Sequence, residues 1–184
     1  MGTNHMGRQS IRFPQPPVVR GFASVAGKKE REGPLGDQFT ATVQDTTFGE
    51  KSWEQAERRM QQMTLELALE KAGLTDADLD AAFAGDLLNQ CIGSSFSLRN
   101  RGVPTLGLYG ACSTMAESLL LAAMSISGGF ARTALAMTSS HFASSERQYR
   151  FPLGYGGQRT PTSQWTVTGA GAVLLGGGER GIRI

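Results

Sequence analysis

Several features that define common classes of protein are scarce in this sequence. Two cysteines among 184 residues are too few for a disulfide framework, and they favour a reducing, cytosolic setting. The formal net charge is only +2, and no lysine and arginine stripe follows the chain, which argues against nucleic-acid binding. Glycine and serine interrupt the apolar runs before they reach the roughly 20 residues that a membrane-spanning helix needs. No metal-ligand spacing, phosphate loop or Ser-His-Asp arrangement is visible.

What remains is the composition of one ordinary folded domain. Hydrophobic residues make up 40% of the chain and charged residues 18%. The first six residues, "MGTNHM", have the character of an expression-tag remnant, so we assign the native domain to residues 7–184. This assignment leaves His141 as the one native histidine.

The order of apolar and polar segments predicts an α/β fold with a mixed, mostly parallel five-stranded sheet and flanking helices. The most regular helix starts at Ser52, where Gln55 completes a capping-box pattern, and stops at Gly73. A second helix follows Cys112 and is apolar on nearly every side, so we expect it to be buried. We expect strands within 18–27, 81–88, 105–111, 131–140 and 165–177, a short helix within 91–102, and polar loops at 27–50 and 141–163.

Cys112 lies where an apolar strand passes into the buried helix. Free backbone N–H groups and the helix dipole at such a point favour a thiolate, and they can also hold an oxyanion or a carboxylate. A free cysteine is, however, more often a buried and unreactive residue. Only His141 is available as a base for Cys112 in this chain, and the alternative for it is one structural hydrogen bond in a loop.

Other polar residues are candidates for binding a carboxylate. Asp86 follows a buried strand, where α/β sheets usually place ligand groups, but capping of the next turn explains it as well. Asn89 and Gln90 offer amide donors, although turn formation is a common role for both. Arg147 and Arg150 could each grip a carboxylate with two N–H groups, whereas an ion pair with a nearby glutamate or plain solvation is the default.

Two levels of resemblance sharpen these expectations. The turn "GACST", with its cysteine opening a buried helix, resembles the thiolase and ketoacyl synthase superfamily, in which two similar halves pack together. The segments "KEREGPLGDQF", "WEQAERRM", "FAGDLLNQ", "LYGACSTMAES", "TSSHFASSERQYRFPLGYGGQ" and "TVTGAGAV" resemble the stage V sporulation protein AD family. These segments lie between about residues 18 and 177 and so cover most of the chain. The chain therefore resembles the N-terminal half of that family's thiolase-like fold, with the second half absent.

The resemblance implies a function in sporulation. It suggests a non-catalytic scaffold that binds dipicolinic acid (pyridine-2,6-dicarboxylate), free or as its calcium salt, for uptake into the developing spore. It also implies a homodimer, a place at the inner forespore membrane beside other proteins of the same operon, and no cofactor apart from that calcium. The alternative is an acyl-transferase or condensing enzyme with Cys112 as nucleophile. The expected ligand contacts are Asp86, Asn89, Gln90, Cys112, Ser113, Thr114, Ser140, His141, Arg147 and Arg150.

Overall fold

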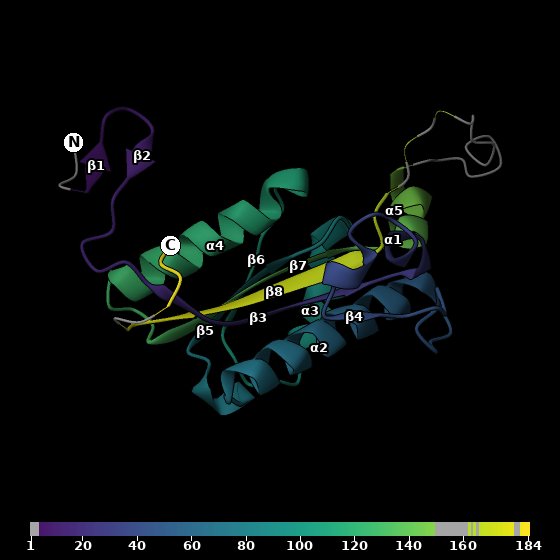
Figure 1. The fold of residues 1–184 in the computed structure, drawn as a ribbon, viewed down its shortest axis with the longest axis horizontal. Helices are drawn as coiled ribbons and strands as arrows, with labels where there is room; N and C mark the ends of the chain where they lie inside the picture. The colour runs from purple at the N-terminus through teal and green to yellow at the C-terminus, as the bar shows by residue number, and fades with distance from the viewer. Residues whose placement is uncertain (1–3, 150–161, 163, 165, 179–180) are drawn as a thin grey trace.

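The computed structural model of the chain describes residues 4–149, 162, 164, 166–178 and 181–184 (Figure 1). The strands are β1 His5–Met6, β2 Ser10–Ile11, β3 Val18–Ala26, β4 Ala41–Thr42, β5 Ala81–Gly85, β6 Thr105–Gly107, β7 Thr133–Ser140 and β8 Gly169–Gly176. The α-helices are α1 Lys28–Arg31, α2 Trp53–Ala72, α3 Ile92–Leu98, α4 Thr114–Ser127 and α5 Phe142–Tyr149. Short 3-10 helices are η1 Gly36–Gln38, η2 Asp76–Asp78, η3 Asn89–Cys91 and η4 Ala111–Ser113.

Six of these strands form one mixed sheet in the order β4-β3-β8-β7-β5-β6. The pairs β3–β4, β5–β6 and β5–β7 are parallel, whereas β8 runs antiparallel to both β3 and β7. The predicted α/β class with a mixed, mostly parallel sheet is confirmed. The predicted count of five strands was low by one, because the two-residue β4 lies within a segment that reads as a polar loop.

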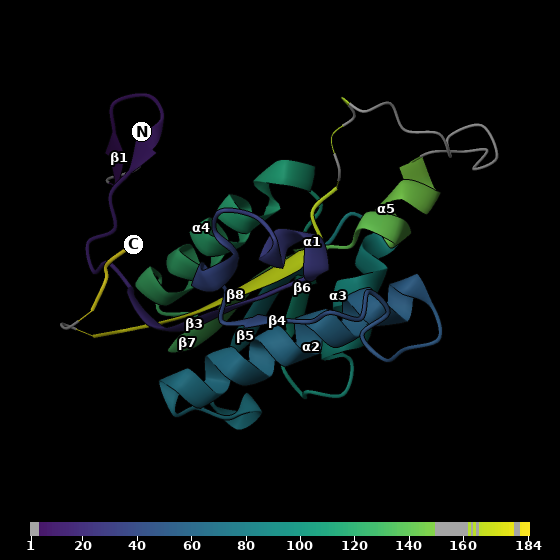
Figure 2. The same ribbon diagram turned by 45° about the vertical axis from the view of Figure 1, so that its right-hand side comes forward.

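Helices cover both faces of the sheet (Figures 1 and 2). On one face, Leu65, Ala68 and Leu69 of α2 join Leu98 of α3 in a core with residues of the central strands. On the other face, Ala122 and Ala123 of α4 pack against apolar residues of the sheet, among them Phe83, Ala134, Ala136 and Leu175. The sheet is therefore the middle layer of three, as the alternation of strands and helices predicts.

The helix α2 matches its sequence signals closely. The Ser52 hydroxyl accepts a hydrogen bond from the Gln55 N–H at 3.2 Å, and Gly73 ends the helix in the left-handed region with φ 65°. Gly21 of β3 lets the helix approach the sheet, because a Cβ there would lie 2.8 Å from the Ala72 side chain. A larger residue at this position would push the helix and the sheet apart.

Two other segments differ from their predicted form. The predicted polar loop after β7 begins with the helix α5. Hydrogen bonds to distant parts of the chain hold this helix in place, and its sequence has no apolar repeat that would have predicted it. The predicted strand 105–111 is reduced to β6, a short and exposed strand at the edge of the sheet rather than a buried one. The predicted strand 81–88 ends at Gly85, because the Asp86 carboxylate accepts the Leu88 N–H and turns the chain.

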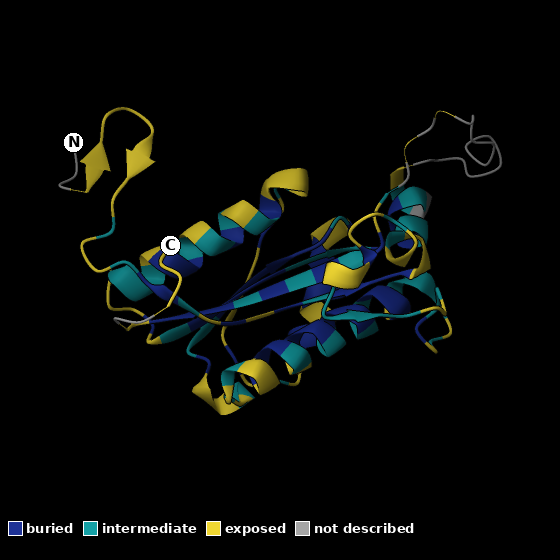
Figure 3. Cartoon of the chain, viewed as in Figure 1, coloured by how far each residue is buried: buried dark blue, intermediate teal, exposed yellow. Residues whose placement is uncertain are grey.

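The burial of α4 is one-sided. Ala122 and Ala123 are fully buried against the sheet, but Leu120 and Met124 on the opposite side are 42% and 44% exposed. Figure 3 shows buried and exposed positions alternating along this helix. The prediction of a helix buried nearly all round is therefore wrong for this chain, although the apolar composition that prompted it is real. Within the described residues, no helix is long and apolar enough to cross a membrane.

Candidate ligand site at the start of α4

A cavity of about 430 Å³ lies where α4 begins. Its wall combines the carboxyl ends of the parallel strands β5 and β7, the turn before α4 and the chain that enters β8. Ligands of α/β sheets are usually bound at this end of the strands. The lining residues are Gly85, Asp86, Leu87, Ala111, Cys112, Thr114, Met115, Thr138, Ser139, Ser140, Thr166, Val167, Gly169 and Gly171.

The Cys112 turn places an accessible thiol on this cavity. Cys112 is exposed and is the middle residue of η4, so that one residue, Ser113, separates it from the start of α4. Ala111, just before it, has a φ of 50°, a left-handed conformation that is costly for a residue other than glycine. The Ser113 and Thr114 N–H groups are bonded within the turn, whereas the N–H groups of Ala111 and Cys112 have no acceptor among the described residues. Two backbone donors therefore accompany the thiol.

Asp86 lines the cavity and also caps the turn that follows β5. The residue is 2% exposed, and its carboxylate accepts hydrogen bonds from the Leu88 N–H at 2.9 Å and from the N–H and hydroxyl of Ser94 at 2.8 and 2.7 Å. The structure thus contains the capping role that the sequence left open, together with a position on the cavity wall. Among the described lining residues, Asp86 is the only charged one.

His141 does not line the cavity within the described part of the chain, and both of its ring nitrogens have partners. Nε2 lies 2.8 Å from the Thr46 carbonyl oxygen, and Nδ1 accepts the Ala143 N–H at 3.2 Å. The ring is fully buried, and it packs against Phe142 and Trp53 with centroid distances of 5.1 and 5.5 Å. Burial lowers the pKa of the imidazole. This arrangement is the structural hydrogen bonding that was the alternative to acid–base work with Cys112.

The other predicted residues are divided between the cavity and its surroundings. Ser140 lines the cavity and donates its hydroxyl to the Val167 carbonyl oxygen at 2.6 Å. Asn89 instead bonds to Gln148 of α5 through both its backbone and its side chain. Gln90 is exposed with φ 59°. The Ser113 hydroxyl donates to Gly110 O, away from the cavity lining. Arg150 and the side chain of Arg147 lie outside what the structure describes.

Sequence reasoning missed a buried polar network behind the cavity wall. Glu57 of α2 is fully buried and accepts hydrogen bonds from the Ser139 hydroxyl at 2.7 Å and the Ser144 hydroxyl at 2.6 Å. Removal from water raises the pKa of Glu57 to about 7, although both serine bonds oppose the shift. The carboxyl therefore titrates near neutral pH, behind a residue that lines the cavity.

Gln61, one turn further along α2, joins the two halves of this network. Its amide nitrogen donates to Ser139 at 2.7 Å and to Ser94 at 3.0 Å, and its carbonyl oxygen accepts from Ser97 at 2.6 Å. Since Ser94 also bonds to Asp86, a continuous chain of hydrogen bonds runs from Asp86 to Glu57. Two polar residues four positions apart, beside the apolar positions of the same helix, were the available sequence signal.

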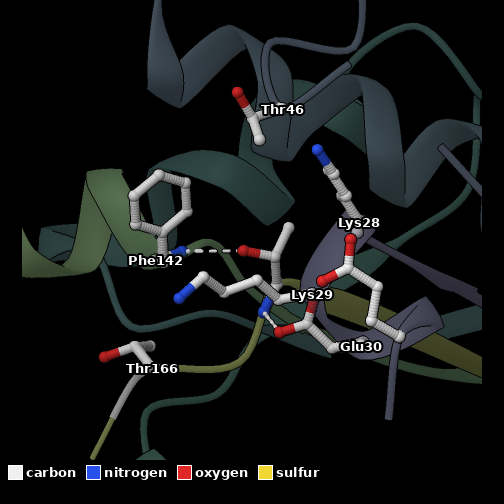
Figure 4. Close-up of a pocket in the computed structure, with 9 residues that line it drawn as sticks. Lys28, Lys29, Glu30, Thr46, Phe142 and Thr166 are labelled. Carbon is white, nitrogen blue, oxygen red and sulfur yellow. Dashed lines mark hydrogen bonds between the residues drawn. The ribbon is translucent and has the colours of Figure 1, made fainter. Parts of the chain in front are cut away.

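A second cavity, of about 250 Å³, lies beside α1 (Figure 4). The Lys29 side chain extends between Phe142 and Thr166, and Lys28 is directed toward Thr46. Glu30 occupies part of the wall and accepts the backbone N–H of the neighbouring Thr168 at 3.0 Å. Because two glutamates and two lysines line this cavity, its charges balance, and no cysteine is among its described lining residues.

Solved structures confirm the fold. The chain is similar to 3-oxoacyl-[acyl-carrier-protein] synthase III from Aquifex aeolicus VF5, with 18% identity and a TM-score of 0.59 over 89% of this chain and 55% of that one. The priming β-ketosynthase of the R1128 polyketide pathway gives 16% identity and a TM-score of 0.58 over 94% and 54%. At this level of identity, the likeness shows a shared thiolase-like fold and not a shared reaction.

Sequence similarity gives the family. Stage V sporulation protein AD of Bacillus subtilis (strain 168) is 44% identical over 169 residues, which cover 92% of this chain and 50% of that protein. The chain thus spans about half the length of this curated relative. The family model for stage V sporulation protein AD matches residues 7–184. The chain therefore belongs to the stage V sporulation protein AD family, and its fold is thiolase-like.

Proposed function

We propose that the Cys112 cavity binds dipicolinate without covalent chemistry, as part of a sporulation protein that serves uptake of this compound into the spore. The observation that carries the proposal is the pairing of an accessible cavity of about 430 Å³ with two backbone N–H donors that have no acceptor among the described residues. This volume falls within the roughly 300–1,000 Å³ of typical small-molecule sites.

The lining residues suit a flat aromatic diacid. The Ala111 and Cys112 N–H groups can donate to one carboxylate at the positive end of the α4 dipole. Thr138 and Thr166 bring further hydroxyl groups to the wall, and Met115 offers a polarisable thioether for contact with the ring. In this arrangement Cys112 is a neighbour of the ligand and not its attacker.

The charge on the wall bears on the form of the ligand. Dipicolinate carries two negative charges at neutral pH, whereas the charged side chain on the described wall is the carboxylate of Asp86. A bare dianion would be repelled by this group. The proposal therefore includes compensation by a cation or a proton, and calcium is suited to the oxygen-rich ligand.

Acyl transfer by Cys112 is the second candidate. The exposed thiol at the start of α4 and the fold shared with condensing enzymes favour it. The bonding of both His141 nitrogens weighs against it, because an acylated cysteine needs a base within reach. A base from outside this chain would have to supply that function.

Calorimetric titration separates the two candidates. We expect saturable heat with dipicolinate, and a much weaker response to benzene-1,3-dicarboxylate, which lacks the ring nitrogen. Cys112→Ala should retain binding, and Cys112→Trp should abolish it by filling the cavity. Ala116→Trp, an exposed position of α4 outside the cavity lining, is the matched control and should bind normally. A flat trace with the wild type at all pH values would refute dipicolinate binding.

Mass spectrometry tests the enzymatic alternative directly. Incubation with acyl-coenzyme A should leave the intact mass of the wild-type protein unchanged if the cavity only binds. An acyl adduct that is present in the wild type and absent in Cys112→Ala would establish Cys112 as a nucleophile instead.

The proposal extends to assembly and location. The exposed edge strand β6 can pair with the same strand of a second copy, so we propose a homodimer formed along this edge. Proteins of the same operon at the forespore membrane are the proposed partners. Light scattering should give the mass of a dimer, and co-purification with tagged operon proteins should retain the chain; a monomer or an empty eluate would contradict the respective part.

A further inference from the structure

The buried network reaches the wall of the Cys112 cavity at two points. Asp86 and Ser139 both line the cavity, and both are bonded into the network behind it. Glu57 is one hydrogen bond removed from the wall, since its Oε1 accepts the Ser139 hydroxyl at 2.7 Å. A change in the charge of Glu57 is therefore felt directly by a residue of the site.

The surroundings of Glu57 provide no compensating cation within the described residues. Asp86 and Glu54 are the nearby carboxylates, and both oppose ionisation of Glu57. His141, directly after β7, has its pKa lowered by burial, which disfavours its cationic form. Arg58, which follows Glu57 in the chain, forms an ion pair with Glu50. The described titratable residues of α5 are Glu146 and Tyr149, and the group that α5 aims at Glu57 is the Ser144 hydroxyl.

Entry of a dianion would bring a third source of negative charge to this region. The chain of hydrogen bonds already has a carboxylate at each end, Asp86 at one and Glu57 at the other. Like charges that share a site favour protonation of the group whose ionised form is stabilised least. That group is Glu57, because it is fully buried and has only hydroxyl partners here, whereas Asp86 accepts a backbone N–H at each carboxylate oxygen.

Protonation would also reverse one hydrogen bond. Ionised Glu57 can only accept, so the Ser139 hydroxyl must donate to it. Protonated Glu57 can donate to the Ser139 oxygen, which already accepts from Gln61. The hydrogen of the Ser139 hydroxyl is then released from Glu57 and becomes available to another acceptor.

We propose that binding of a dicarboxylate in the Cys112 cavity is coupled to the uptake of one proton from solvent by Glu57, with Ser139 as the link between them. This inference rests on the proposed function, because it requires an anion in that cavity. The balance is simple: the ligand enters with two negative charges, one proton moves from the buffer to the Glu57 carboxylate, and no covalent bond to the ligand forms or breaks.

The ionisation of Glu57 sets the pH range in which the coupling is visible. Burial raises its pKa to about 7, so in the unliganded protein the Glu57 carboxyl is largely protonated at pH 6 and largely ionised at pH 8. If binding requires the protonated form, the affinity for the ligand should fall above pH 7, with a limiting slope of about tenfold per pH unit. Below pH 6 the proton is already in place, and this contribution should level off.

The test is calorimetric titration of dipicolinate at pH 6, 7 and 8, in two buffers that differ in ionisation enthalpy. For the wild type, we expect the heat at pH 8 to depend on the buffer by an amount that corresponds to about one proton. Glu57→Gln should lose this dependence and bind at pH 8 about as well as at pH 6. Glu70→Gln, the same change at an exposed position of α2, is the matched control and should behave like the wild type.

The outcomes separate this inference from the function on which it rests. Saturable binding with no proton uptake, or with equal pH dependence in wild type and Glu57→Gln, overturns the coupling and leaves dipicolinate binding intact. No heat at any pH overturns both. If Glu57→Gln does not fold, infrared difference spectra of wild type and Ser139→Ala decide: ligand addition at pH 8 should increase the protonated-carboxyl band in the wild type and less in Ser139→Ala, and equal spectra refute the link.

Discussion

The ionisation of Glu57 predicts an unusual pH dependence of stability, which can be measured without any ligand. Its ordinary pKa is 4.5 and its value in the folded chain is about 7. Because the folded pKa is the higher one, the stabilisation is fully present below pH 4.5 and is lost as the pH rises through 7. At about 1.4 kcal/mol per pKa unit, this difference corresponds to roughly 3 kcal/mol of unfolding free energy.

The assay is chemical denaturation, followed by circular dichroism, at a series of pH values from 4 to 8. As the pH rises from 4 to 8, we expect the unfolding free energy of the wild type to fall by roughly 3 kcal/mol relative to that of Glu57→Gln. The amide can accept from Ser139 and donate to Ser144, whose hydroxyl has a second acceptor in the His141 carbonyl oxygen, so the variant should fold. Glu70→Gln should run parallel to the wild type. A constant difference between wild type and Glu57→Gln at all pH values would refute a raised pKa.

Further predictions concern packing, capping and thiol access. Leu174→Ala empties a fully buried position and should cost about 2–5 kcal/mol in denaturant titrations. Gly21→Ala places a Cβ 2.8 Å from an α2 side chain and should lower the melting temperature; an unchanged value would contradict the close packing. Ser52→Ala removes a helix cap and should cost about 1 kcal/mol in the same titrations. Iodoacetamide should label the exposed Cys112 in the native protein. Cys91 is buried, and burial raises the pKa of its thiol, so it should be labelled only after unfolding. Mass spectrometry that finds Cys91 labelled and Cys112 unlabelled in the native protein would contradict this.

Local signals predicted those parts of the fold whose determinants lie close together in the sequence. The helix α2 begins after Ser52 and ends before Gly73 because a capping hydroxyl and a left-handed glycine act within one turn of the helix ends. The place of Cys112 before α4 followed from the same reasoning, and so did the position of Asp86 after β5. These residues reach the cavity because parallel strands end at one edge.

The remainder depended on contacts that no local pattern encodes. The helix α5 has a polar sequence, and it is held by bonds such as those from Ser144 to Glu57 and from Tyr149 to the Leu87 carbonyl oxygen. The spacing of Glu57 and Gln61 on α2 can be seen in the sequence, but their partners on β7 and α5 are far away along the chain, so no local pattern predicts the network. The exposure of Leu120 and Met124 depends on what packs beside α4, which the apolar repeat does not specify.

The position of β8 has a consequence for how the molecule forms. This strand is the last long element in the sequence, yet it lies between β3 and β7 and hydrogen-bonds to both. Until Gly169–Gly176 is inserted, the first long strand has no partner in the centre of the sheet, and the two halves of the sheet remain unconnected. Closure of this gap joins segments about 150 residues apart, so assembly of the central layer should be a comparatively slow step that cannot precede the synthesis of Gly169–Gly176.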